Sequence, residues 1–297
     1  MARSALSMLT TMPMPEDPRA FDTMLGVPSN RDSWQKEFTH VHDKGSADLK
    51  HPAGYMFKDL PEVDGSIDYV DYLIHEMDKW GVAQGLVPVY QGDEYGTRAV
   101  KTHPDRLYGV YLIDPNKGMD DVRALQHANR ELGAIAAACF PSGTNPQVSI
   151  NGKQMYPFYA KCVELDIPMF INAGVPGPRM RMEAQHVMHL DEVCYDFPEL
   201  KIVTRHGGEP WEELLVKLML KWPGLYYSTS AFAPKHFPKA IINYANTRGA
   251  NKVMYAGYFP SGLSLERIFT ELRSVPFKDD VWPKFLRENA LRVLNLT

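Results

Sequence analysis

The chain is poor in cysteine. Its three cysteines, Cys139, Cys162 and Cys194, stand far apart and form no C-x-x-C pair. This spacing argues against a disulfide framework and against a cysteine-rich zinc site. It fits a reducing compartment, so we expect a cytoplasmic protein.

Several other signatures are missing. No basic run occurs, and 32 basic against 36 acidic residues give a formal net charge of −4, so we expect no nucleic-acid partner. No run of about 18 apolar residues is present, so we expect no membrane-spanning segment. The apolar residues within positions 1–14 are interrupted by Thr and Pro, which is not typical of a signal peptide. G-x-G-x-x-G, G-x-x-x-x-G-K-[ST] and G-x-S-x-G are absent, which weighs against Rossmann, P-loop and serine-hydrolase proteins.

What the sequence does contain is a regular alternation of short apolar runs with longer amphipathic ones. The expected strands cover residues 21–27, 82–89, 107–113, 134–140, 167–173, 201–205, 225–229 and 253–258. The expected helices cover residues 66–80, 119–132, 155–165, 184–195, 211–221, 239–247, 265–272 and 280–294. Strands that alternate with helices indicate a parallel sheet, and eight such units favour a closed (β/α)8 TIM barrel.

We therefore expect one α/β domain over residues 1–297, with residues 1–20 as an N-terminal arm. The last helix, over 280–294, is an extra C-terminal element outside the barrel. Residues 28–65 fit no helical pattern and form a long loop insertion after the first strand. Loops of this length are commonly lids, and here the loop would cover the C-terminal mouth of the barrel, where active sites lie.

Polar residues and glycines cluster where three of the strands end. The fifth strand is followed by INAG (171–174), the sixth by TRHGGEPW (204–211) and the eighth by AGYFP (256–260). Polar side chains at the mouth end of barrel strands are typical of a functional site. The glycines allow a ligand to approach the backbone closely.

From about Pro52 to the C-terminus the chain resembles the amidohydrolase-related family. The motifs that carry the resemblance are HPAGYMFKD (51–59), FINAGVPG (170–177), LDEVCYDFPELKIVTRHGGEPW (190–211), NTRGANKVMYAGYFPSGLSLER (246–267) and NALRVLNL (289–296). This family includes metal-dependent decarboxylases, hydratases and hydrolases. The resemblance implies a (β/α)8 barrel and an oligomer.

The resemblance also implies a metal site that this chain has largely lost. The family combines H-x-H on the first strand, a histidine on each of the fifth and sixth strands, and an aspartate on the eighth. Here Met24 and Gly26 stand at the H-x-H positions, Asn172 at the fifth-strand histidine and Tyr258 at the aspartate, so only His206 remains. Zinc is normally held by at least three His, Cys or carboxylate ligands, so we expect no metal cofactor.

One alternative keeps a metal in the protein. Thr39-His40-Val41-His42-Asp43 places two histidines on one side of an extended segment within the long loop. Together with His206, His40 and His42 would form a three-histidine site for zinc, iron or manganese. Solvated loop histidines are the simpler interpretation of the same residues.

Without a metal, His206 is the expected acid/base, because it is the one imidazole at the mouth. Tyr258 and Asn172 would donate hydrogen bonds to a developing oxyanion. Asp22 or Glu209 would orient His206 or carry a second proton. Each also has a structural interpretation: Asp22 as a turn cap, and Glu209 as the partner of a neighbouring helix.

Substrate binding is assigned to cationic and aromatic side chains. Arg205 or Arg179 would bind a carboxylate through bidentate contacts, although Arg205 is equally well explained as a structural ion-pair partner. An apolar or aromatic substrate body is suggested by the aromatic residues of the mouth region: Tyr55, Phe57, Tyr90, Phe140, Phe232 and Trp211.

These residues favour an enzyme, a hydrolase or a lyase of the decarboxylase or hydratase type, that acts on a small carbonyl or carboxylate compound. The alternative is a catalytically silent subunit, in a hetero-oligomer with a related metal-containing chain. A third interpretation is a binding protein that uses the same pocket without turnover. For an enzyme that acts alone we expect a homo-oligomer.

Overall fold

The computed structural model describes residues 14–27, 38–46, 48–49, 51–57, 61, 63, 66–90, 92 and 95–297. Eight strands form one parallel sheet and are hydrogen-bonded in chain order from β1 to β8. They are β1 (Ala20–Asp22), β2 (Val82–Pro88), β3 (Leu107–Leu112), β4 (Ala134–Cys139), β5 (Met169–Asn172), β6 (Ile202–Arg205), β7 (Leu225–Ser228) and β8 (Val253–Met254).

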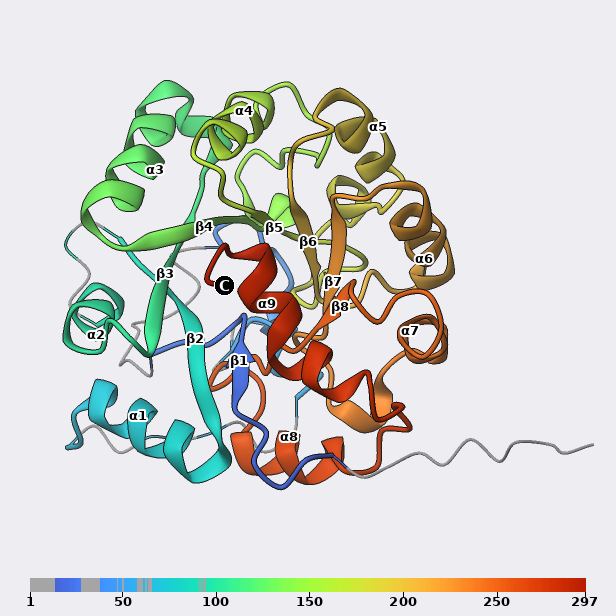
Figure 1. Ribbon diagram of the computed structural model, residues 1–297. Coiled ribbons are helices and arrows are strands. Elements are labelled where there is room, and N and C mark those ends of the chain that lie inside the picture. The colour runs from blue at the N-terminus through green and yellow to red at the C-terminus, as the bar shows by residue number, and fades with distance from the viewer. Residues whose placement is uncertain are drawn as a thin grey trace, which may run out of the picture.

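Helices follow the strands and surround them (Figure 1). They are α1 (Tyr69–Trp80), α2 (Gly96–Thr102), α3 (Met119–Glu131), α4 (Tyr156–Glu164), α5 (His189–Asp196), α6 (Glu212–Lys221), α7 (Lys239–Ala245), α8 (Leu265–Leu272) and α9 (Asn289–Val293). The expected alternation of helices with eight parallel strands is confirmed. Two details were missed: α2 was not predicted, and the segment expected as one final helix contains a π-helix, η7 (Lys284–Glu288), before α9.

Helix α1 illustrates how local sequence fixes an element. The Asp68 side chain accepts hydrogen bonds from the first turn, and Gly81, with φ of 69°, ends the helix in the left-handed conformation. Buried Val70, Leu73 and Met77 recur at helical spacing and face the core. Burial of one such apolar stripe against the barrel holds the helix in place.

The sheet curls so that its two edge strands approach each other. Beyond β1 and β8, the Gly26 N–H donates to the Phe259 carbonyl (2.7 Å) and the Tyr258 N–H to the Met24 carbonyl (3.1 Å). These strands are shorter than expected for local reasons. The Asp22 side chain accepts from the Met24 N–H (2.9 Å) and turns the chain after β1. The Tyr255 N–H bonds to Phe285 of η7 rather than to β7. The result is a TIM-barrel-like α/β fold.

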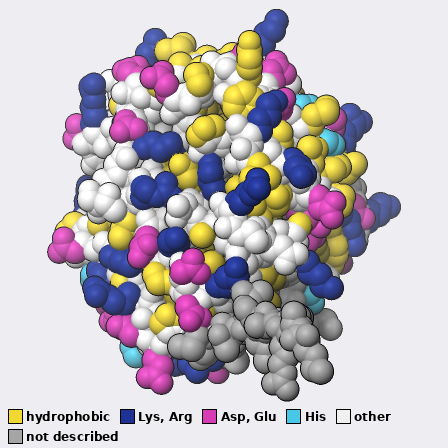
Figure 2. Space-filling model, turned by 45° about the vertical axis from the view of Figure 1, so that its right-hand side comes forward, with side chains coloured by type: hydrophobic (Ala, Val, Ile, Leu, Met, Phe, Trp, Pro, Cys, Tyr) yellow, Lys and Arg dark blue, Asp and Glu magenta, His cyan; other side chains and the backbone are white. Residues whose placement is uncertain are grey.

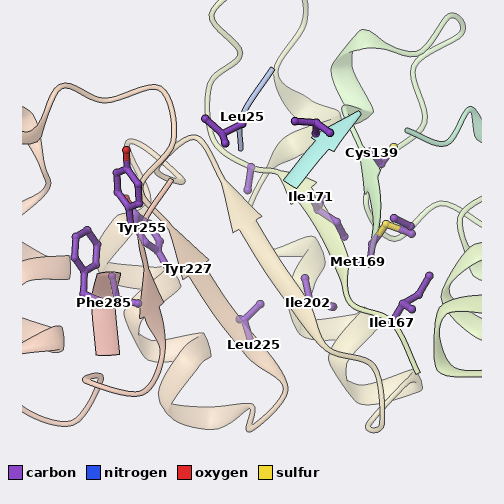
Figure 3. Close-up of a cluster of buried hydrophobic side chains, with 14 of the residues drawn as sticks. Leu25, Cys139, Ile167, Met169, Ile171, Ile202, Leu225, Tyr227, Tyr255 and Phe285 are labelled. Atoms are coloured by element: carbon purple, nitrogen blue, oxygen red, sulfur yellow. The ribbon is translucent and has the colours of Figure 1, made fainter. Parts of the chain in front are cut away.

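Side chains alternate between the inside and the outside of the barrel. An inner apolar cluster takes one face of every strand: Phe21, Leu86, Val110, Ala136, Ala138, Phe170, Val203, Tyr226 and Met254. The alternate residues pack outward; they include Met169, Ile202 and Leu225, and belong to a larger buried cluster with the helices (Figure 3). This period of two matches the pleat of strands that are buried on both faces.

Helix α9 lies over one end of the barrel (Figure 1), and its Ala290 and Val293 join the inner cluster. Just beyond it, Asn295 bonds to Lys201, before β6, and to Asp166, before β5. The starts of the strands are therefore covered by the C-terminal segment. This leaves the opposite end, where the strands terminate, for a ligand.

Parts of the expected arm and loop fall outside the described residues, namely 1–13 and, within the loop, 28–37, 47, 50, 58–60, 62 and 64–65. Among the described residues, no helix combines the length and the apolar character needed to cross a membrane. On the face in Figure 2, Lys and Arg side chains are interspersed with acidic and apolar ones.

Candidate active site at the barrel mouth

Three adjacent strands end in an unusual backbone conformation. His206 after β6, Ala231 after β7 and Tyr258 after β8 have φ values of 64°, 71° and 62°. Such left-handed conformations are unfavourable for residues other than glycine, and they concentrate at functional sites. The other non-glycine residues with left-handed φ in the described part of the chain, Arg19, Asp166 and Asn295, lie where strands start, so this conformation supports the mouth as a site only together with the polar side chains there.

Ser230 holds His206 in place. The His206 N–H donates to Ser230 Oγ (3.0 Å), and the same oxygen lies 3.2 Å from His206 Nδ1. Ser230 is fully buried, and within the described residues Nδ1 is the one acceptor in reach of its hydroxyl proton. On this ground we assign the hydrogen of the neutral ring to Nε2 and leave Nδ1 as the acceptor.

The surroundings of His206 keep the ring neutral. Burial, together with the nearby positive charge of Arg205, lowers the pKa of His206 to about 3. A neutral imidazole with hydrogen on Nε2 is a hydrogen-bond donor, as in enzymes that use imidazole as an electrophile. This environment favours a donor over the proton exchange near pH 7 that the sequence suggested.

Tyr258 and Asn172 both lie near the end of β6. The Tyr258 ring meets the His206 ring edge to face, with centroids 5.1 Å apart. Burial raises the pKa of Tyr258 to about 12, so the phenol keeps its proton. Asn172 pairs in register with Arg205 on the neighbouring strand, and its side-chain amide makes no hydrogen bond within the described part of the chain. Both are available as donors to a ligand.

Asp22 is a buried carboxyl group whose two oxygens have different surroundings. Oδ1 accepts from the Met24 and Gly257 N–H groups, each at 2.9 Å. Oδ2 makes no hydrogen bond of standard geometry within the described residues, but the Tyr255 hydroxyl lies close enough to interact with the carboxyl group and to lower its pKa. Gly257 leaves room for this carboxyl group because it has no side chain. A Cβ atom at position 257 would come within 2.5 Å of Asp22 Oδ2 and 2.6 Å of the Tyr255 hydroxyl. Burial outweighs the hydrogen bonds and raises the pKa of Asp22 to about 6.

Arg205 is a buried cation without a paired carboxylate in the described residues. Its Nη2 donates to the Thr23 carbonyl (3.2 Å), and its guanidinium lies 4.7 Å above the Phe170 ring. Nε has no partner within the described residues. Burial lowers the pKa of Arg205 to about 10, so the group remains charged. A buried guanidinium of this kind is well suited to a ligand carboxylate.

Sequence reasoning did not single out His51, which the structure places in this site. Its ring lies edge to face with Tyr258 (6.4 Å) and Phe57 (5.6 Å), and Phe57 also contacts Tyr258 (5.9 Å). Burial lowers the pKa of His51 to about 4. The HPAGYMFKD motif contains this residue, but nothing in its spacing reveals that the loop folds back over the end of β8.

Two of the expected substrate contacts lie elsewhere. Arg179 forms an ion pair with Asp43 and stacks 4.6 Å above the Tyr55 ring, while the Tyr55 hydroxyl donates to the Gly177 carbonyl (2.6 Å). These contacts fasten the long loop to the loop after β5. Arg179 and Tyr55 are about half exposed, so they are loop contacts rather than pocket residues.

The other expected residues take varied positions. Trp211 stacks on His186 with centroids 4.0 Å apart, and Phe140 packs against Phe38 at 5.7 Å. Glu209 makes no hydrogen bond to His206. Its backbone carbonyl accepts from the Val175 N–H (2.8 Å), and burial raises the pKa of its carboxyl group. Of these, Phe140 lies at the end of β4, on the rim of the mouth.

The donor set does not fit the metal that the family implies. Within the described residues, no three His, Cys, Asp or Glu side chains are grouped closely enough to hold an ion. At the positions where the resemblance implies ligands besides His206 stand Met24, Gly26, Asn172 and Tyr258, and burial raises the pKa of the Tyr258 phenol. His40 and His42 form no such group with His206; instead His40 Nε2 lies 3.0 Å from the Ser142 carbonyl.

A separate hollow of about 340 Å³ lies outside the barrel, between α5 and α6. It is lined by Asn151, Met188, His189, Asp191, Glu192, Tyr195, Lys221 and Trp222. None of the mouth residues described above contributes to it.

Comparison with known proteins agrees with this architecture. The sequence model of the amidohydrolase family (Amidohydro_2) matches residues 39–296. A 2-keto-4-carboxy-3-hexenedioate hydratase from Sphingobium sp. is 27% identical over 128 residues, and the match spans 37% of this chain and only 38% of the hydratase.

Two solved structures share the fold. An uncharacterised TIM-barrel protein from Bordetella bronchiseptica has a TM-score of 0.70 and 20% identity, over 93% of this chain and 98% of that one. A 5-carboxyvanillate decarboxylase from Novosphingobium aromaticivorans, solved as a mutant with bound manganese and a nitrobenzoic acid, has a TM-score of 0.63. It is 18% identical, over 93% of this chain and 96% of its own.

Proposed function

Because the chain belongs to the amidohydrolase family, we propose that it is a hydrolase or a lyase of the decarboxylase or hydratase type. Its substrate is a small carbonyl or carboxylate compound with an apolar or aromatic body, bound in the barrel mouth. The family and the reactions of the hydratase and the decarboxylase support this kind of chemistry. The observation that carries the proposal is the convergence of hydrogen-bond donors around one buried cation.

The donors have distinct tasks. Arg205 carries the positive charge and binds the substrate carboxylate. His206, through Nε2–H, and the Tyr258 hydroxyl stabilise negative charge that develops on a substrate oxygen. Preorganised donors act most strongly where water is excluded, and Arg205 and Asn172 are buried.

Asp22 is the proton carrier of this proposal. Its pKa of about 6 lies close to the working pH, which suits a group that must both accept and release a proton. His206, with a pKa of about 3, is far less suited to accept one. Oδ2, which accepts neither of the two backbone N–H bonds, is the atom on which the proton would reside.

The reaction proceeds without the family's metal, since Arg205 and the neutral donors supply the stabilisation of negative charge instead. The protein works in the cytoplasm as a homo-oligomer. The other assignment, a silent subunit beside a related metal-containing chain, predicts no turnover from the purified chain alone.

Turnover by the purified full chain tests the proposal. A panel of carboxylated phenols and unsaturated keto acids, including 5-carboxyvanillate and 2-keto-4-carboxy-3-hexenedioate, is followed by ultraviolet absorbance and CO2 release. We expect turnover of at least one compound. His206→Ala should reduce kcat about a hundredfold, the usual effect of removing one oxyanion donor, whereas His127→Ala on the exposed face of α3 should not change it. Equal rates for the two variants would refute the proposed role of His206.

A further inference from the structure

The barrel mouth contains a second imidazole beside the first. His51 comes from the long loop and His206 from the end of β6, and both rings lie edge-on to the one Tyr258 ring, with centroids 6.4 and 5.1 Å away. The two rings are close enough for His51 to contribute to the electrostatic environment of His206. Two chain segments that are distant in sequence thus place imidazoles on one phenol ring.

The hydrogen-bond pattern of His51 fixes which nitrogen carries hydrogen. The backbone N–H of Ala53 donates to His51 Nδ1 (3.1 Å). A nitrogen that accepts this bond is unprotonated, so the neutral ring carries its hydrogen on Nε2. The contact is local and does not depend on any bound ligand.

His206 reaches the same state through a different partner. Its Nδ1 faces the buried Ser230 hydroxyl at 3.2 Å, and we assign the hydrogen to Nε2 because this hydroxyl has no other acceptor within the described residues. In each ring Nδ1 contacts a donor of the protein itself, so Nε2–H is the group that can donate to a ligand. Neither Nε2 has a hydrogen-bond acceptor within the described residues.

The groups around the two rings also supply donors or apolar surface. Arg205 is the charged group that acts on His206, and Phe57 and Tyr258 pack against His51. No carboxylate is hydrogen-bonded to either imidazole within the described residues. A buried site that presents several N–H donors without acceptors is complementary to an anionic oxygen.

We infer that His51 and His206 form a clamp of two neutral imidazoles, which binds one anionic oxygen group, a carboxylate or an enolate, through their two Nε2–H donors. His51 is thereby a ligand-contacting residue that the long loop supplies. The inference rests on the proposed function for the location of the site, but it concerns how the anion is bound rather than which reaction follows.

Nitrogen NMR of the full chain labelled with 15N-histidine tests the clamp directly, with benzoate as the probe. We expect the signals of both residues, identified from their loss in His51→Phe and His206→Gln, to show hydrogen on Nε2 at neutral pH. Addition of benzoate should shift both Nε2 signals. Hydrogen on Nδ1 of His51, or an Nε2 signal of His51 that benzoate leaves unmoved, would overturn the inference.

Two substitutions at one position separate the donor from the ring. His51→Phe keeps an aromatic ring and removes the N–H, and should weaken benzoate binding about tenfold, the effect of one hydrogen bond to a charged group. His51→Gln keeps an N–H donor and should bind benzoate more tightly than His51→Phe. His127→Gln, on exposed α3, is the matched control and should bind as the unaltered chain does. Circular dichroism checks that every variant is folded.

The outcomes for the clamp and for the proposed function are distinct. Benzoate binding that requires the His51 N–H, without turnover of any compound in the panel, would support the clamp and contradict the enzymatic proposal. Turnover together with equal benzoate affinity in His51→Phe and the unaltered chain would support the enzymatic proposal and contradict the clamp. If the unaltered chain does not bind benzoate, the clamp is refuted.

Discussion

Replacement of Asp22 by Asn should stabilise the protein at neutral and alkaline pH. The side chains are nearly isosteric, and the amide oxygen of Asn can accept the N–H bonds of Met24 and Gly257. The pKa of Asp22 rises from 3.8 to about 6 on folding, so the folded state disfavours the ionised form. At 1.36 kcal/mol for each pKa unit, ionisation of Asp22 costs the folded state about 3 kcal/mol.

The sign of this effect sets its pH dependence. A carboxyl group whose pKa is raised on folding favours the native state below its unfolded pKa, and this advantage is lost as the pH rises through the folded value. The unfolding free energies of Asp22→Asn and the unaltered chain should therefore converge below pH 3.8 and differ most above about pH 6. The difference should then approach 3 kcal/mol in favour of Asn.

Urea unfolding followed by circular dichroism, from pH 4 to pH 8, measures this difference. Asp105→Asn, at an exposed carboxylate before β3, is the control and should show no such trend. A difference that is constant with pH, or that grows toward low pH, would refute the view that Asp22 is a carboxyl group with a raised pKa. It would also remove Asp22 as the proton carrier.

Three further outcomes follow from the contacts at the mouth and in the loop. Ser230→Ala should remove the hydrogen-bond partner of His206 Nδ1 and reduce kcat about fivefold, the effect of one hydrogen bond of about 1 kcal/mol. The 15N NMR spectrum of His206 should then show a mixture of tautomers, and an unchanged spectrum would contradict the hydrogen-bond assignment. Arg205→Gln should weaken benzoate binding about tenfold or more in calorimetry, because a charge-assisted bond is lost; unchanged affinity would place the carboxylate elsewhere. Arg179→Met should leave benzoate affinity unchanged while it loosens the loop to proteolysis near Asp43, and a large loss of affinity would restore Arg179 to the pocket.

The sequence predicts the architecture well, because the physics that sets it is local and periodic. Apolar runs separated by amphipathic segments require strands buried under helices, and the eight observed strands follow from that alternation. Helix α2 escaped prediction because only Gly96, Thr97 and Ala99 are buried along its seven residues, which gives no apolar stripe. The boundaries of β1 and β8 depend on contacts with Asp22 and η7, which no local pattern contains.

The sequence predicts the position of those candidate site residues that end or follow strands; their roles stay a prediction. Asp22, Asn172, Arg205, His206 and Tyr258 all follow or end strands, so the topology alone brings them to one end of the sheet. Their hydrogen-bond partners and protonation states were not predictable, since they depend on burial and on distant segments such as Ser230.

Residues in the long loop and in the loop after β5 were the hardest to place. Arg179 and Tyr55 were expected in the pocket and instead hold two loops together, whereas His51 was overlooked and lies beside Tyr258. The fold of a loop is set by individual contacts rather than by a periodic pattern. The sequence alone therefore indicates neither the loop contact of Arg179 with Tyr55 nor the position of His51 beside Tyr258.

The central claim is that this pocket works through neutral donors and a buried guanidinium instead of a metal. Elemental analysis of catalytically active protein, purified without added metal and again after dialysis against a chelator, tests it most directly. We expect far less than one equivalent of zinc, iron or manganese per chain, and the same turnover rate before and after dialysis. One equivalent of a transition metal that leaves together with the activity, and restores it when returned, would contradict the claim.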